Sequence, residues 1–104
     1  TALLIYLTDI NQGKLLTETL KKDSFHVILA ENIDQTLIQL RQINFRILIF
    51  DSDLPGAEQE SINATIKSLR SNTLTVETNE DEEMDIVLSK IREKLKQYKL
   101  NHSQ

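Results

Sequence analysis

Three short apolar runs, each followed by a segment with helical spacing, constrain the fold of this chain more than any other feature. They are ALLIYL at 2–7, FHVILA at 25–30 and RILIFD at 46–51. Continuous apolar runs of this length are typical of strands that are buried on both faces of a sheet. A fourth run, TLTVET at 73–78, contains β-branched residues and predicts a weaker strand.

The segments between these runs carry apolar residues at helical spacing. Helices are predicted over 11–23, 32–44, 60–71 and from Asn79 onward. Asn79 and Glu82, three positions apart, fit a capping box at the start of the last helix. Because strands and helices alternate, we predict βαβ units, a mostly parallel sheet and helices on both faces, which is an α/β sandwich of three layers.

Composition limits the function classes. The 104 residues suit one domain, which we expect over 1–100 with a frayed tail at 101–104. A net charge of -4 and an aromatic content of 5% argue against nucleic-acid binding. No apolar run is long enough to span a bilayer. The absence of cysteine suggests a reducing compartment, the cytoplasm, and the first residue, Thr1, suggests a piece of a larger protein.

Acidic residues follow two of the predicted strands. Asp51 ends the run at 46–51, and Asp9 lies just past the run at 2–7. In parallel sheets the working site lies at the carboxyl ends of the strands, so both carboxylates are expected in one crevice. Each also has a local explanation, because Asp51 can accept hydrogen bonds in the following turn and Asp9 can cap the first helix.

RILIFDSDLPG at 46–56 and LLTETLKKDSFHVILAEN at 15–32 resemble the receiver domains of response regulators, over residues 2–78 in all. The resemblance implies that Asp51 is the position phosphorylated by a histidine kinase. It also implies that Mg²⁺ is held by acids after the first strand, by Asp51 and by the backbone carbonyl of Asp53. Thr78 matches the family's switch hydroxyl, although it can equally be an ordinary strand-end residue.

The chain departs from the family in two places. The family's acidic pair falls on Leu7 and Thr8, and Asp9 comes one position late. After Thr78 the family has a fourth helix, a fifth strand and a lysine, whereas this chain continues directly with its last helix. Lys90 echoes that lysine but lies in helical register. We therefore predict four parallel strands in the order 2-1-3-4, without the fifth strand, and weak or vestigial Mg²⁺ binding.

Three functions remain open. The preferred one is a degenerate receiver-like module that acts by protein–protein or interdomain contact, without enzymatic activity and without a cofactor. The second is a working phosphoacceptor that uses Asp51, Asp9 and Mg²⁺. The third is a flavodoxin-like domain that binds a small ligand in the same crevice.

Expected partners are a histidine kinase, an output domain or a second copy, with no nucleic acid and no membrane. The end of the last helix offers a candidate interaction surface formed by Leu95, Tyr98 and Leu100. The alternative is that this apolar stripe simply covers the sheet.

Overall fold

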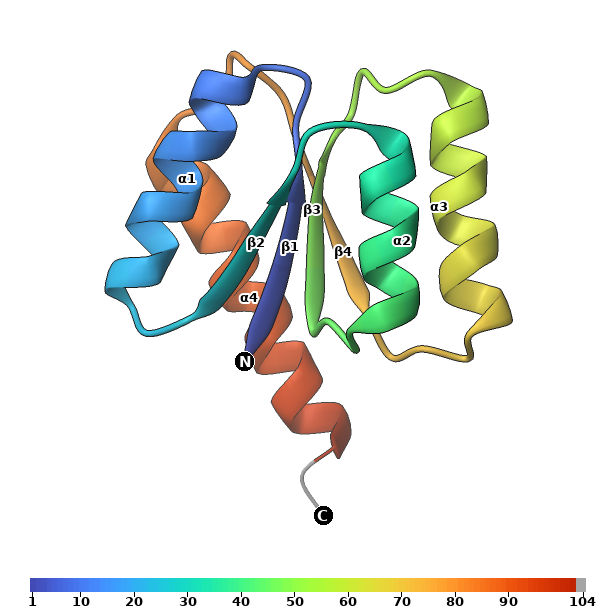
Figure 1. The fold of residues 1–104 in the computed structure, drawn as a ribbon. Coiled ribbons are helices and arrows are strands. Elements are labelled where there is room, and N and C mark those ends of the chain that lie inside the picture. The colour runs from blue at the N-terminus through green and yellow to red at the C-terminus, as the bar shows by residue number, and fades with distance from the viewer. Residues whose placement is uncertain (103–104) are drawn as a thin grey trace.

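The computed structural model describes the backbone of residues 1–102 and the side chains of residues 1–97. Strands and helices alternate along this range (Figure 1). In chain order the elements are β1 (Ala2–Tyr6), α1 (Ile10–Lys22), β2 (His26–Ala30), α2 (Ile33–Gln42), β3 (Ile47–Asp51), α3 (Gly56–Ser68), β4 (Leu74–Thr78) and α4 (Met84–His102). The predicted α/β class is confirmed.

All strand pairs in the sheet are parallel. β1 pairs with β2 and β3, and β4 pairs with β3, which gives the order β2-β1-β3-β4. The predicted order of four strands is therefore confirmed, and β2 and β4 form the two edges. Across the described part of the chain, no helix combines the length and the apolar character needed to cross a membrane.

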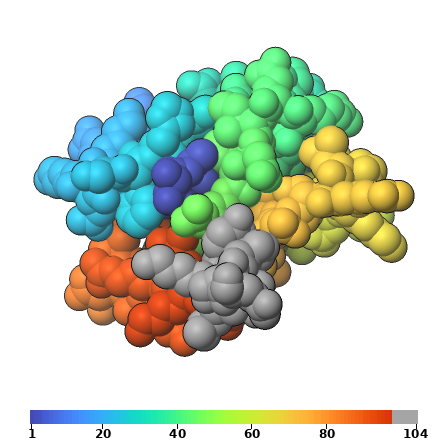
Figure 2. All heavy atoms as spheres, turned by 90° about the horizontal axis from the view of Figure 1, so that it is seen from below, coloured from blue at the N-terminus to red at the C-terminus, as the bar shows by residue number. Residues whose placement is uncertain are grey.

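The helices cover both faces of the sheet, so the molecule has three layers. Figure 1 shows α1 and α4 on one face and α2 and α3 on the other. In Figure 2, seen from below, the blue start of β1 lies between these two groups of helices. Both faces of the central strands are thus removed from water, as their continuous apolar sequences require.

The core is divided by the sheet into two clusters, because successive side chains of a strand point to opposite faces. The α1/α4 cluster contains Leu3, Ile5, Leu7, Leu16, Leu20, Val27, Ile47, Ile49, Val76, Val87 and Ile91. The α2/α3 cluster contains Leu4, Tyr6, Ala30, Leu40, Phe45, Leu48, Phe50, Leu54 and Ile62. The central strands β1 and β3 contribute to both.

α1 and α2 begin within one residue of the prediction, whereas the other two helix starts differ by several residues. α3 begins at Gly56 rather than at residue 60, because Pro55 leads straight into the helix. α4 begins at Met84 rather than at Asn79. The side chain of Asn79 accepts the N–H of Asp81 at 2.9 Å, which closes a turn over residues 79–83. The predicted capping box at Asn79 is therefore wrong.

Candidate functional site

Asp51 ends the most deeply buried strand of the sheet. Its side chain is 1% exposed, and every residue of β3 before it is buried as well. An ionised carboxylate in such a place is costly unless hydrogen bonds compensate for the lost hydration. The partners of Asp51 therefore decide what this residue can do.

Both oxygens of the Asp51 carboxylate accept a hydrogen bond from the chain itself. Thr8 Oγ1 donates to Oδ2 at 2.5 Å, and the Asp53 N–H donates to Oδ1 at 2.9 Å. Short distances are typical of a hydroxyl that donates to a charged acceptor. The Thr8 contact joins the segments that follow β1 and end β3, so Asp51 ties two central strands together.

The turn after Asp51 is fixed by packing and by the backbone. The Leu54 N–H donates to the Asp51 carbonyl at 3.2 Å, and the Leu54 side chain, 4% exposed, packs in the α2/α3 cluster. The side chain of Asp53 is exposed. The Leu-Pro-Gly sequence thus anchors the turn and starts α3, while Asp53 supports Asp51 through its backbone.

Asp9 caps α1. Its Oδ1 accepts the N–H of Asn11 at 2.9 Å and the N–H of Gln12 at 3.3 Å. An acidic N-cap satisfies backbone donors that have no partner within the helix. Of the two roles predicted for Asp9, the structure shows the cap.

The residues at this edge do not fit a Mg²⁺ site. Leu7, at the first position of the family's acidic pair, is 3% exposed within the α1/α4 cluster, and Thr8, at the second, donates to Asp51. The described residues contain no group of three or more acidic, His or Cys side chains placed to hold a metal ion. Since Mg²⁺ demands near-octahedral oxygen ligands, Asp51 with the capped Asp9 and the carbonyl of Asp53 is a poor set.

Thr78 lies beside Asp51. The two residues are register partners at the carboxyl ends of β3 and β4, and the Ser52 N–H donates to the Thr78 carbonyl at 2.8 Å. The Thr78 side chain is 2% exposed, and its hydroxyl donates to the Asn79 carbonyl at 3.5 Å, the long limit for a hydrogen bond. The structure thus brings Thr8, Asp51 and Thr78 to one edge.

The turn at 79–83 is held by two side chains whose partners the sequence did not reveal. Gln12 Nε2 donates to the Asn79 carbonyl at 3.2 Å. Lys90 Nζ donates to Glu82 Oε2 at 2.7 Å and to the Glu77 carbonyl at 3.1 Å. Lys90, which echoes the family's lysine, therefore binds the turn and the edge strand rather than Asp51. The three contacts join residues 8 to 67 positions apart, and no local motif signals them.

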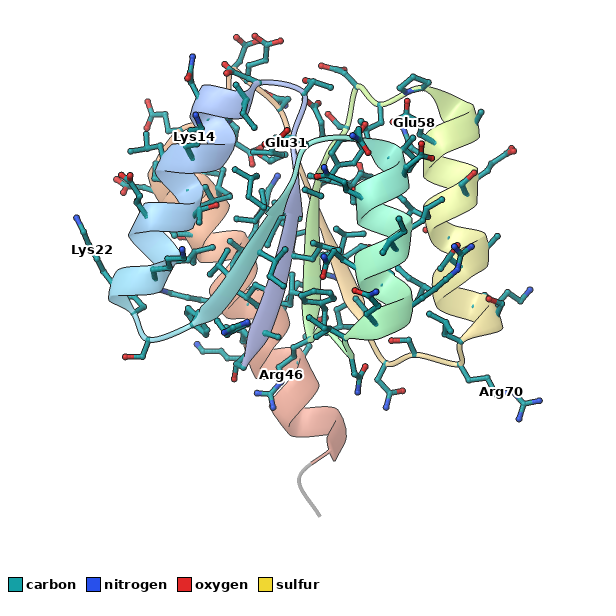
Figure 3. All side chains as sticks on the ribbon, in the orientation of Figure 1. Lys14, Lys22, Glu31, Arg46, Glu58 and Arg70 are labelled. Atoms are coloured by element: carbon teal, nitrogen blue, oxygen red, sulfur yellow. The ribbon has the colours of Figure 1, made fainter. Side chains whose placement is uncertain are left out.

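Tyr6 and Glu58 form a polar contact between β1 and α3. The Tyr6 hydroxyl donates to Glu58 Oε1 at 2.6 Å. Glu58 lies at the end of α3 that is level with the carboxyl ends of the strands (Figure 3). Burial, then the hydrogen bond to Glu58 and its negative charge, raise the pKa of Tyr6 to about 12.

We expect Tyr6→Phe to remove a contribution to the free energy of unfolding that the Tyr6 hydroxyl makes and that decreases at alkaline pH. Between pH 10 and 12 the unfolded chain loses the Tyr6 proton while the folded protein keeps it, so the contribution of this group to the free energy of unfolding falls, by about 1 to 2 kcal/mol after allowance for solvent screening. The advantage of the parent protein over Tyr6→Phe should therefore shrink over this range in urea unfolding. An advantage that stays constant from pH 9 to 12 would contradict the assignment.

The candidate surface at the end of α4 is only partly described. Leu95 is partly buried and packs against the α1/α4 cluster, as expected if the stripe covers the sheet. Tyr98 and Leu100 lie outside the residues whose side chains the structure describes. An interaction role for Leu95, Tyr98 and Leu100 remains a prediction.

Comparison with protein-family models and with curated proteins gives no match. Solved structures do match. A two-component response regulator from Clostridium difficile has a TM-score of 0.71 at 14% identity, over 92% of this chain and 96% of that chain. The response regulator TrrA from Thermotoga maritima, solved in complex with Mg²⁺-BeF, has a TM-score of 0.66 at 18% identity, over 93% and 97%.

The receiver domain of the hybrid histidine kinase CckA has a TM-score of 0.68 at 11% identity, over 91% of this chain and 99% of that chain. At these identities the matches establish the fold. This chain has the fold of response-regulator receiver domains, with a sheet of four parallel strands in the order β2-β1-β3-β4.

Proposed function

We propose that this chain is a receiver-like module of a two-component or phosphorelay protein that acts through protein–protein or interdomain contacts and does not accept a phosphoryl group. The fold supports the receiver-like class. One observation supports the loss of phosphotransfer: the hydroxyl of Thr8, where the family carries an acid, donates to Asp51.

The chemistry of transfer explains why this contact matters. A carboxylate that attacks phosphorus must present a free oxygen, and the metal or another cation must neutralise the phosphoryl oxygens. Here one carboxylate oxygen of Asp51 is bonded to Thr8 and the other to the Asp53 N–H. Lys90 donates to Glu77 and Glu82 instead. Asp51 therefore serves as a structural link between β1 and β3.

A working phosphoacceptor is the second candidate, favoured by one specific observation. Asp51 and Thr78 stand as register partners at the carboxyl edge, where the family carries its acceptor and its switch hydroxyl. Phosphorylation would then require Thr8 to release Asp51 and Mg²⁺ to bind with few carboxylates. We rank this candidate below the interaction module for that reason.

Titration with Mg²⁺ followed by fluoroberyllate, monitored by amide NMR shifts, separates the two candidates. We expect no saturable shift at Thr8, Asp51 or Thr78 at millimolar Mg²⁺, and no fluoroberyllate binding, because the site lacks acidic ligands. Asp51→Asn is the matched control, and its response should equal that of the parent. Saturable shifts in the parent that disappear in Asp51→Asn would favour the phosphoacceptor.

The proposal implies a protein partner, either a histidine kinase or an output domain, and a cytoplasmic location. Asp51→Asn should then leave partner binding intact, since the residue acts within the fold rather than as a site of modification.

A further inference from the structure

Within the described part of the chain, β4 pairs with β3 on one side and with no strand on its outer side. The Leu74 N–H donates to the Arg46 carbonyl, and the Thr78 carbonyl accepts the Ser52 N–H. The backbone N–H and carbonyl groups of Leu74 and Thr78 therefore point toward β3. Backbone groups alternate in direction along a strand, so Thr75 and Glu77 direct theirs away from the sheet. Such an edge is a template for a further strand.

A groove runs along this edge between β4 and α4. It has a volume of about 240 Å³ and is lined by Thr75, Val76, Glu77, Lys90, Glu93 and Lys94. Two of these residues are acidic and two are basic, so the groove has no net formal charge although the whole chain carries -4. Two copies of this surface can therefore meet without net repulsion between the patches.

Lys90 occupies part of the edge. Its ammonium donates to the outward carbonyl of Glu77 at 3.1 Å and is held there by Glu82 at 2.7 Å, while the side chain stays 43% exposed. Charged side chains at a strand edge, lysine above all, are a common device against unwanted pairing, and here the lysine comes from α4. An added strand must displace this ammonium before it can bond to Glu77.

We propose that β4 pairs in antiparallel fashion with β4 of a second copy of this chain, and that Lys90 limits this pairing. The inference names a partner surface for the proposed interaction function and rests on that function. A two-fold axis at Val76 sets Thr75 of each copy opposite Glu77 of the other. Each such pair can exchange two backbone hydrogen bonds, because these two residues carry the outward groups.

This register suits a second copy in particular. The outward N–H and carbonyl groups of Thr75 and Glu77 lie symmetrically on either side of Val76. An isologous contact requires this symmetry, because the same strand must supply the hydrogen-bonding groups of both copies. The two Glu77 side chains each face a Thr75 rather than one another, which avoids like charges directly opposite. Thr75 and Glu77 are polar, which suits an extended sheet whose surface at the junction faces water.

Sedimentation equilibrium of the 104-residue chain and its variants over a concentration series tests the inference. We expect Lys90→Met, which removes the ammonium and keeps an unbranched side chain only one atom shorter, to tighten the dimer about tenfold. Lys94→Met is the matched control: it removes the same charge from the same groove without a bond to Glu77, and it should not tighten association.

Thr75→Pro in the Lys90→Met background should return the protein to a monomer. Proline removes an outward N–H that pairs with none of the described strands of the monomer, and such positions tolerate it. Should this variant fail to fold, amide hydrogen exchange of Thr75 and Glu77 in Lys90→Met replaces it, with protection that rises with protein concentration.

Two results would overturn the inference: a Lys90→Met chain that stays monomeric, or a dimer whose Thr75 and Glu77 amides exchange freely. Either result would mean that the outer edge of β4 pairs with a strand of another protein or with no strand at all. Neither depends on whether Mg²⁺ and fluoroberyllate bind at Asp51, so this failure is distinct from a failure of the proposed function.

Discussion

Leu7→Asp is expected to unfold the domain near neutral pH, with a loss on the order of 5 kcal/mol. Leu7 is 3% exposed and packs in the α1/α4 cluster. The substitution removes buried apolar surface and places a carboxylate in the core without a partner, and a loss of this size is comparable to the whole stability of a small domain.

Urea unfolding measures this effect, and the chain provides a matched control. Leu15 is 56% exposed on α1, so Leu15→Asp makes the same chemical change at the surface and should cost less than about 1 kcal/mol. A Leu7→Asp protein with parental stability would show that position 7 can still hold an acid. The account of the lost Mg²⁺ site would then be wrong.

Thr8→Asp is expected to destabilise the protein by about 3 kcal/mol at pH 7 without divalent cations. The change removes the 2.5 Å hydrogen bond to Asp51 and sets a second carboxylate beside the first. Millimolar Mg²⁺ should restore part of the loss, because a cation that binds only the folded state stabilises it.

Thermal unfolding with and without Mg²⁺ tests this expectation, and Thr8→Asn is the control, because it has the same shape as Asp and no charge. We expect the melting temperatures of Thr8→Asn and of the parent to be insensitive to Mg²⁺. If Mg²⁺ raises the melting temperature of the parent as much as that of Thr8→Asp, then Thr8 does not prevent Mg²⁺ from binding at Asp51. A Thr8→Asp protein as stable as the parent would show that the Thr8 contact contributes little.

The sheet could be predicted because its strands are short apolar runs with few other interpretations. ILIFD can avoid water on both faces only within a sheet covered by helices, which made β3 and its neighbours predictable from the sequence. The strand order, in contrast, came from the resemblance to receiver domains and from the absence of residues for a fifth strand. Periodicity alone does not encode it.

The helix starts were harder to predict because local signals favour more than one outcome. Pro55 and Gly56 are typical turn residues, yet proline also suits the start of a helix, and α3 begins there. Asn79 is a good N-cap, but its side chain closes a turn instead, and Gln12 from α1 bonds to its carbonyl. That contact spans 67 residues, so no local pattern could predict it.

The candidate site was predictable in position but not in its bonding. The positions of Asp51 and Thr78 follow from the carboxyl ends of their strands. The role of Thr8 does not, because a threonine after a strand has many possible partners, and only the three-dimensional structure shows that its hydroxyl meets Asp51. For Asp9 the sequence left two roles open, and the geometry of α1 selects the cap.

Both ends of the described chain lie at the same end of the sheet. Figure 1 shows the start of β1 and the last turn of α4 on the side opposite the carboxyl ends of the strands, where Asp51 is located. A fluorescent protein, an affinity tag or a surface tether fused at either terminus would therefore leave from the side away from the crevice. Such a fusion can report on binding at the Asp51 edge without covering it, and a single tethering chemistry can be used at either terminus.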